Sequence, residues 1–251
     1  MISEKTVDNF AWLLLSISFV FWCICLFTKF FRFGYFDWDL AIITQALWML
    51  GQGSQYFSLG DYNFFGDHAN YIALFFVPLI KIFPHPLTLI VVKIVAFHAA
   101  ALSFYLIAKK FIEPLAAILM TLTFLIFPAN VMSMLYEFNF DIIGMILLLW
   151  MIYAFIVNNY SLFIWSSIFG LLVKENMYLV FIMFGLMALF LKKDRLKWGV
   201  VPVVSGAILF YTVMFHLIPY YRGLIRVALL LVIYAWEQVW ERSCYLSFCI
   251  P

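Results

Sequence analysis

Two carboxylates stand at the start of an amphipathic segment, just after the first apolar run of the chain. They are Asp37 and Asp39, and apolar residues at helical spacing follow them directly. One aspartate at a helix start often serves only as a cap, because its oxygen accepts an amide hydrogen of the first turn. Two carboxylates exceed that need. The pair therefore predicts a general base or metal ligand at the lipid–water boundary, with Asp39 and Asp37 as the catalytic candidates and capping as the alternative.

Two further pairs of ionisable residues are candidates for substrate binding. Asp67 and His68 follow a stretch rich in glycine and aromatic residues, where His68 is suited to carry a proton or contact a phosphate. Lys174 and Glu175 interrupt an apolar stretch. Ionisable side chains at membrane depth are costly and usually face a cavity or a partner. We therefore expect Lys174 to reach an anionic substrate, with Glu175 balancing the charge of Lys174 or positioning it. The alternatives are a hydrated loop for Asp67-His68 and a hydrated turn for Lys174-Glu175.

A short acidic turn joins two apolar runs. Glu137, Asn139 and Asp141 alternate there with aromatic residues, so in an extended turn they face one way. Carboxylate and amide oxygens are the ligands that hard divalent cations prefer. Glu137 and Asp141 are thus predicted to hold a divalent metal, Mg²⁺ or Mn²⁺, unless they are simply solvated. The sequence contains no phosphate-binding glycine loop, nucleophile elbow or zinc-binding helix.

Composition indicates the solvent in which these residues must be positioned. The chain is 67% hydrophobic and 11% charged, whereas soluble domains have about 45–50% apolar and about 25% charged residues. A soluble fold of this length could not bury so much apolar surface. We expect an all-α integral membrane protein in contact with membrane lipids. A net charge of +2 is too small to indicate a nucleic-acid partner.

Apolar runs of roughly 20 residues predict membrane spans. Seven runs approach this pattern, at residues 10–27, 87–108, 114–127, 142–157, 162–173, 177–191 and 198–218. We expect one transmembrane module over residues 1–222, with 31–86 as a large first loop. Residues 223–251 are interpreted as an eighth span followed by an atypical, truncated tail.

The segment 71–83 decides the orientation of every later span. It is short and contains Pro78 and Lys81. If it does not cross, the basic clusters at 109–110 and 192–197 lie in the cytoplasm, as the positive-inside rule favours. We therefore predict that 71–83 lies at the outer leaflet, that loop 31–86 is outside, and that the protein is a multi-pass cell-membrane protein with a cytoplasmic amino terminus.

The large loop has its own predicted helix at residues 39–51. Its apolar residues recur at helical spacing, and Gln45 lies on a narrow polar stripe beside them. Such a stripe suits a helix lying in the membrane interface. The apolar positions are Leu40, Ile43, Leu47 and Leu50.

The order of these features resembles a family of prokaryotic membrane proteins of unknown function related to the GT-C glycosyltransferases. The resemblance covers about residues 31–191. It is carried by the stretch 34–40 with Gln45 and Trp48, by Asp67-His68, by Pro78 and the turn 83–86, by Glu137-Phe138-Asn139 and by Lys174-Glu175.

GT-C enzymes carry an aspartate in the first outer loop, often a second acidic site in the next outer turn, and use polyprenyl-phosphate-linked sugars as donors. The resemblance implies that Asp39 matches the first aspartate, that Glu137 and Asp141 match the second site, and that Gln45 joins the substrate-binding candidates. It implies a glycosyltransferase-like function at the outer face with that donor as partner. A solute or lipid transporter and a non-catalytic scaffold are the alternatives, although no internal repeat of the transporter kind is visible.

Overall fold

The computed structural model describes residues 4–35, 38–59 and 62–223. Asp37 and the predicted eighth span and tail lie outside the described residues. The fold within them is mostly helical. Its α-helices are α1 Glu4–Phe31, α2 Asp39–Gly51, α3 Val77–Ile82, α4 Leu87–Ala108, α5 Pro114–Ile126, α6 Pro128–Leu135, α7 Asp141–Ile156, α8 Tyr160–Leu171, α9 Asn176–Leu191, α10 Val201–Thr212 and α11 Ile218–Tyr221.

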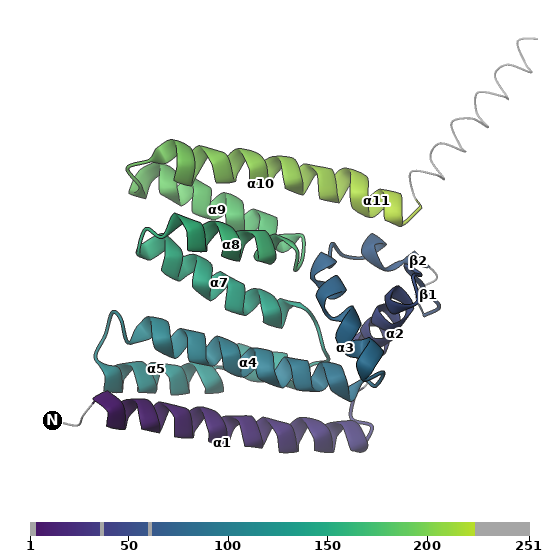
Figure 1. Ribbon diagram of the computed structural model, residues 1–251, viewed down its shortest axis with the longest axis horizontal. Coiled ribbons are helices and arrows are strands. Elements are labelled where there is room, and N and C mark those ends of the chain that lie inside the picture. The colour runs from purple at the N-terminus through teal and green to yellow at the C-terminus, as the bar shows by residue number, and fades with distance from the viewer. Residues whose placement is uncertain (1–3, 36–37, 60–61, 224–251) are drawn as a thin grey trace, which may run out of the picture.

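Shorter elements complete the chain. Two 3₁₀ turns, η1 Phe64–Gly66 and η2 Tyr71–Phe75, precede α3, and the strands β1 Tyr56–Phe57 and β2 Tyr62–Asn63 pair antiparallel. Two π-helical segments, η3 Leu196–Val200 and η4 Val213–Leu217, interrupt the last long helix. The helices α1, α4, α7, α8, α9 and α10 run side by side, and α2, α3 and the strand pair gather at one end of this bundle (Figure 1).

Length and composition make several of these helices candidates to cross a membrane. Three qualify alone, Lys5–Phe31, Leu87–Ala108 and Leu196–Tyr221, and α5 with α6 forms a fourth candidate bent by 46°. The outward face of α1 suits lipid contact, because Phe10, Ile17 and Ile24 are each more than half exposed. Helices α7, α8 and α9 are apolar but shorter, so the expected seven or eight spans stay a prediction.

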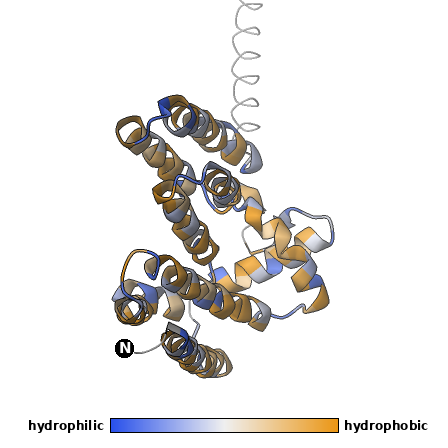
Figure 2. Cartoon of the chain, turned by 60° about the vertical axis from the view of Figure 1, so that its left-hand side comes forward, coloured by the Kyte–Doolittle hydropathy of each residue, from blue (hydrophilic) through white to orange (hydrophobic). Residues whose placement is uncertain are grey.

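The chain turns at the same two ends of the bundle throughout. The connections α1–α2, α3–α4, α6–α7 and α8–α9 lie at one end, together with the end of α11 (Figure 1). The connections α4–α5, α7–α8 and α9–η3 lie at the other. Figure 2 shows that hydrophobic residues dominate the helices and that hydrophilic residues gather at the turns. The basic clusters 109–110 and 192–197 are therefore at the end opposite to the acidic turns.

The segment 71–83 contains only a short α-helix, and its place at the outer leaflet stays a prediction. Its α-helix, α3, has 6 residues and is about 9 Å long, against a hydrocarbon core of roughly 30 Å. It packs beside α2 at the acidic end (Figure 1). Helix α2 has the predicted bounds, and Leu40, Ile43 and Leu47 of its apolar face are buried.

Candidate functional site

A polar cavity of about 250 Å³ lies at the acidic end of the bundle. Helix α2, the 57–70 loop, the turn before α7 and the turn before α9 all contribute to its walls. Residues widely separated in sequence meet there because these connections lie at one end of the bundle (Figure 1). The predicted site residues that line it are Asp39, Asp67, His68, Asp141 and Lys174, and Asn139 of the acidic turn lines it as well.

Asp39 is the first residue of α2 and lines the cavity. Its Oδ2 accepts a hydrogen bond of 2.9 Å from the hydroxyl of Tyr136, which lines the same cavity. Tyr136 was not among the predicted site residues. Its position directly before Glu137 in the sequence is the signal that could have identified it.

Glu137 caps the helix that carries Asp39. Its side chain is 2% exposed, and its Oε2 accepts a hydrogen bond of 2.6 Å from the amide of Leu40. The residue preceding α2, Trp38, makes no side-chain capping bond. A carboxylate is favourable at this position because unpaired amides and the helix dipole concentrate positive charge there. The capping role considered for Asp39 therefore belongs to Glu137.

The two predicted metal ligands have different surroundings. Asp141 lines the cavity and lies 3.4 Å from Lys174 Nζ, whereas Glu137 faces the amide of Leu40. Within residues 4–35, 38–59 and 62–223, no three His, Cys, Asp or Glu side chains are grouped closely enough to hold a metal. Glu137 and Asp141 do not make a metal site by themselves, and Mg²⁺ or Mn²⁺ binding stays a prediction.

A buried lysine donates hydrogen bonds to the backbone of the acidic turn. Lys93 of α4 is 2% exposed, and its Nζ donates to the carbonyl oxygens of Tyr136 at 2.6 Å and Glu137 at 3.0 Å. Lys93 was not among the predicted site residues. Its cost inside an apolar run was the available signal for a larger role.

Glu175 pairs with His68 instead of positioning Lys174. His68 Nδ1 lies 2.8 Å from Glu175 Oε1, and the amide of Ala69 donates to Oε2 at 3.1 Å. Burial acts to raise the pKa of Glu175, but hydrogen bonds from His68 and from the backbone amides of Glu175 and Ala69 outweigh it and lower this pKa to about 2. The hydrogen bond to Glu175 raises the pKa of His68 above its ordinary value. This pair joins the 57–70 loop to the start of α9.

The residue that follows α11, Arg222, contacts the same loop. Arg222 Nη2 lies 3.0 Å from Asp67 Oδ1, and Arg222 Nε donates to the carbonyl of Gly66 at 2.7 Å. A Cβ on Gly66 would lie 2.8 Å from the backbone nitrogen of Arg222. Glycine is therefore required for this close approach. The interaction places a fixed positive charge next to Asp67.

Two other predicted site residues are not seen at the cavity. Gln45 donates to Ser58 Oγ at 2.7 Å and accepts from the amide of Leu59 at 3.3 Å. It therefore holds the loop against α2 and is not among the residues lining the cavity. The position of Asp37, the second catalytic candidate, lies outside the described residues.

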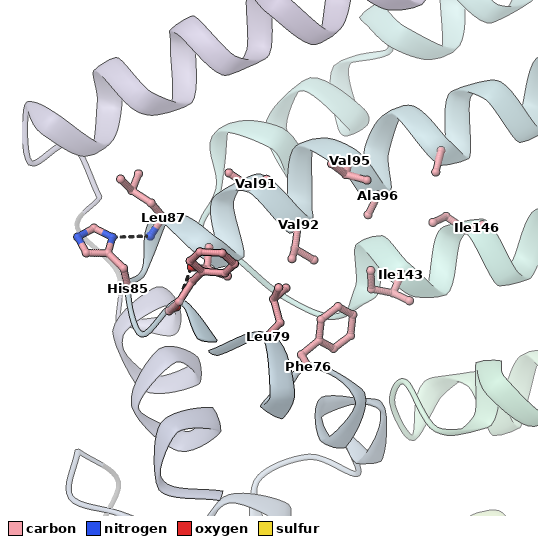
Figure 3. A pocket seen from close by; sticks show the side chains of 13 residues that line it. Phe76, Leu79, His85, Leu87, Val91, Val92, Val95, Ala96, Ile143 and Ile146 are labelled. Atoms are coloured by element: carbon pink, nitrogen blue, oxygen red, sulfur yellow. Dashed lines mark hydrogen bonds between the residues drawn. The ribbon is translucent and has the colours of Figure 1, made fainter. Parts of the chain in front are cut away.

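A larger apolar cavity of about 820 Å³ lies next to the polar one. Helices α3, α4 and α7 form its walls, and Leu79, Val92 and Ile143 point into it (Figure 3). Phe76 lines the apolar cavity and Phe140 lines the polar one, with ring centroids 5.8 Å apart. The linings of the two cavities are therefore in contact through this aromatic pair.

Apolar helices long enough to cross a bilayer, with charged residues collected at one end around a cavity, define a helical membrane protein. Residues 29–230 match the family described as "Predicted membrane protein (DUF2079)", and the chain belongs to that family. This agrees with the resemblance to a membrane-protein family of unknown function. No curated protein and no solved structure matches the chain.

Proposed function

We propose that this protein is a membrane glycosyltransferase of the GT-C kind that takes a polyprenyl-phosphate-linked sugar as donor. The observation that carries the proposal is that the linings of a charged cavity and an apolar cavity meet at the contact between Phe140 and Phe76. An amphiphile with a phosphorylated head and a long hydrocarbon chain needs both environments next to each other. The polar cavity has room for about eight waters, which suits a single sugar with its phosphate.

The charged groups support a division of roles. Asp39 acts as the general base that takes the proton of an acceptor hydroxyl. The acceptor oxygen bonds to the anomeric carbon, and the bond from that carbon to the phosphate oxygen breaks. Polyprenyl phosphate leaves with the bonding electron pair. Lys174 and protonated His68 stabilise the phosphate charge, with Lys174 exchanging its contact to Asp141 for the phosphate. No step of this mechanism uses a metal.

The proposal includes a membrane orientation. The polar cavity faces outward, the basic clusters 109–110 and 192–197 lie in the cytoplasm, and the amino terminus is cytoplasmic, in line with the positive-inside rule. Helices α1, α4, α7, α8, α9 and α10 cross, and α5 with α6 crosses as one bent span. The shorter helices α7 to α9 require locally thinned lipid at this site.

A binding experiment tests the proposal. The purified protein in nanodiscs is titrated with polyprenyl phosphate and, separately, with the uncharged polyprenol of the same length. We expect the phosphate to bind at least about tenfold more tightly, and Lys174→Met to remove most of this difference. Equal affinity of the parent protein for the two lipids would rule out a site that recognises the phosphate. Solute flux into liposomes without lipid discrimination would favour a transporter.

A further inference from the structure

We infer that Lys93 and Glu137 are positioning residues that hold Asp39 at the polar cavity. This inference rests on the proposed function, because it assumes that the place of Asp39 matters for chemistry. Glu137 was assigned to metal binding from the sequence, and Lys93 was not among the predicted site residues. The contacts of the turn 135–137 support the new assignment.

Two lysines from the bundle hold the backbone of this turn. Lys93 of α4 donates to the carbonyls of Tyr136 and Glu137, and Lys29 of α1 donates to the carbonyl of Leu135. Leu135 is the last residue of α6. The carbonyls at a helix end have no partner within the helix, and cations are favourable there. Three consecutive carbonyls are therefore anchored to two helices of the bundle.

The side chains of the same turn reach α2. Glu137 Oε2 accepts from the amide of Leu40 at 2.6 Å, and the hydroxyl of Tyr136 donates to Asp39 Oδ2 at 2.9 Å. Two adjacent residues of the turn thus contact two adjacent residues at the start of α2. The backbone carbonyls of the turn 135–137 bind lysines of α1 and α4, and its side chains bind the start of α2. The turn therefore connects α2 to the helical bundle.

Burial indicates that these contacts have a purpose beyond packing. Lys93 and Glu137 are each 2% exposed. Placing two ionisable groups in such surroundings is costly compared with apolar residues of similar size. A leucine or methionine at position 93 would occupy a similar volume, but it would leave the carbonyls of Tyr136 and Glu137 without their donor. The contribution of Lys93 and Glu137 is to hold the first turn of α2 in a fixed orientation.

Hydrogen exchange tests the inference without any assumption about the substrate. In the intact protein in nanodiscs, the peptide that covers the start of α2 is followed in Glu137→Ala, Glu137→Gln and Lys93→Met. We expect exchange about tenfold faster in Glu137→Ala and in Lys93→Met. Glu137→Gln keeps an acceptor oxygen for the Leu40 amide, so it should remain close to the parent. Lys193→Met, an exposed lysine at the opposite end, is the matched control.

The functional readout separates positioning from stability. For the two disruptive variants we expect transfer to fall about tenfold or more while polyprenyl phosphate binding stays within about twofold, because the contacts to the lipid are intact. If a disruptive variant does not fold, Tyr136→Phe removes only the hydroxyl contact to Asp39 and carries the same expectation for transfer. Unchanged exchange in both disruptive variants, or accelerated exchange with full transfer, would overturn the inference. A parent protein that binds no polyprenyl phosphate would count against the proposed function alone, since the exchange result would still decide the link.

Discussion

The carboxylate of Glu137 lies 2.6 Å from the amide nitrogen of Leu40, a residue 97 positions earlier in the chain. The first turn of α2 is thus capped by a residue from the turn before α7. This leaves the neighbouring carboxylate, Asp39, to contact the Tyr136 hydroxyl and face the polar cavity. The two carboxylates therefore have separate roles: Glu137 caps α2, and Asp39 lines the cavity.

Asp39→Asn should abolish activity and leave the fold intact. Asn keeps an oxygen that accepts from Tyr136, so we expect the free energy of unfolding to change by less than about 0.5 kcal/mol. Loss of a general base removes roughly 10²–10⁴-fold of rate. Thermal unfolding and glycosyl transfer are measured side by side, with Glu113→Gln at the opposite end as the control. A stable Asp39→Asn protein with full transfer would exclude Asp39 as the base.

The His68–Glu175 pair should make stability depend on pH. The folded pKa of Glu175 is lowered from 4.5 to about 2, so its contribution is complete above pH 4.5 and is lost as the pH falls toward 2. The pKa of His68 is raised above 6.5, so its contribution is complete below pH 6.5 and is lost as the pH rises through the folded value. The pair therefore stabilises most between pH 4.5 and 6.5.

The measurement is the difference in Tm between the parent and Glu175→Gln across this range. We expect the largest difference near pH 5.5 and a smaller one at both extremes. A Tm difference that does not change with pH would mean that His68 and Glu175 do not form a charge-assisted hydrogen bond.

The apolar cavity should bind the hydrocarbon chain of the donor. Val92→Trp places a large ring where Val92 points into the cavity (Figure 3), so we expect the affinity for polyprenyl phosphate to fall about tenfold or more. Val204→Trp adds the same ring on an exposed face of α10 and serves as the control. Equal affinity in the two variants would place the lipid chain elsewhere.

Labelling of intact cells tests the orientation. In a background with the native cysteines replaced by serine, Gln52→Cys lies on an exposed turn at the acidic end and Lys193→Cys lies at the basic end. A membrane-impermeant maleimide should label position 52 and should label position 193 only after the cells are permeabilised. The reverse pattern would invert the membrane orientation and place the polar cavity in the cytoplasm.

The helices of this protein were determined by its sequence to a large extent. The predicted stretches 39–51 and 87–108 coincide with α2 and α4, and the other predicted spans agree with helices within a few residues, apart from the ends of α1. Helix formation depends on local periodicity and on the lack of breakers, both of which are present in a short window. The segment 71–83 contains only a short α-helix, as its shortness in the sequence indicated, because length is a local property; that it does not cross stays a prediction.

The partners of the charged residues were decided only by the tertiary structure. Glu175 was predicted to position Lys174, its sequence neighbour, but it contacts His68, and Lys174 contacts Asp141 instead. Neighbours at the start of a helix point in different directions, so adjacency in sequence does not make them partners. Which distant residue each one meets depends on how the helix ends pack at one end of the bundle, and no local pattern specifies that packing.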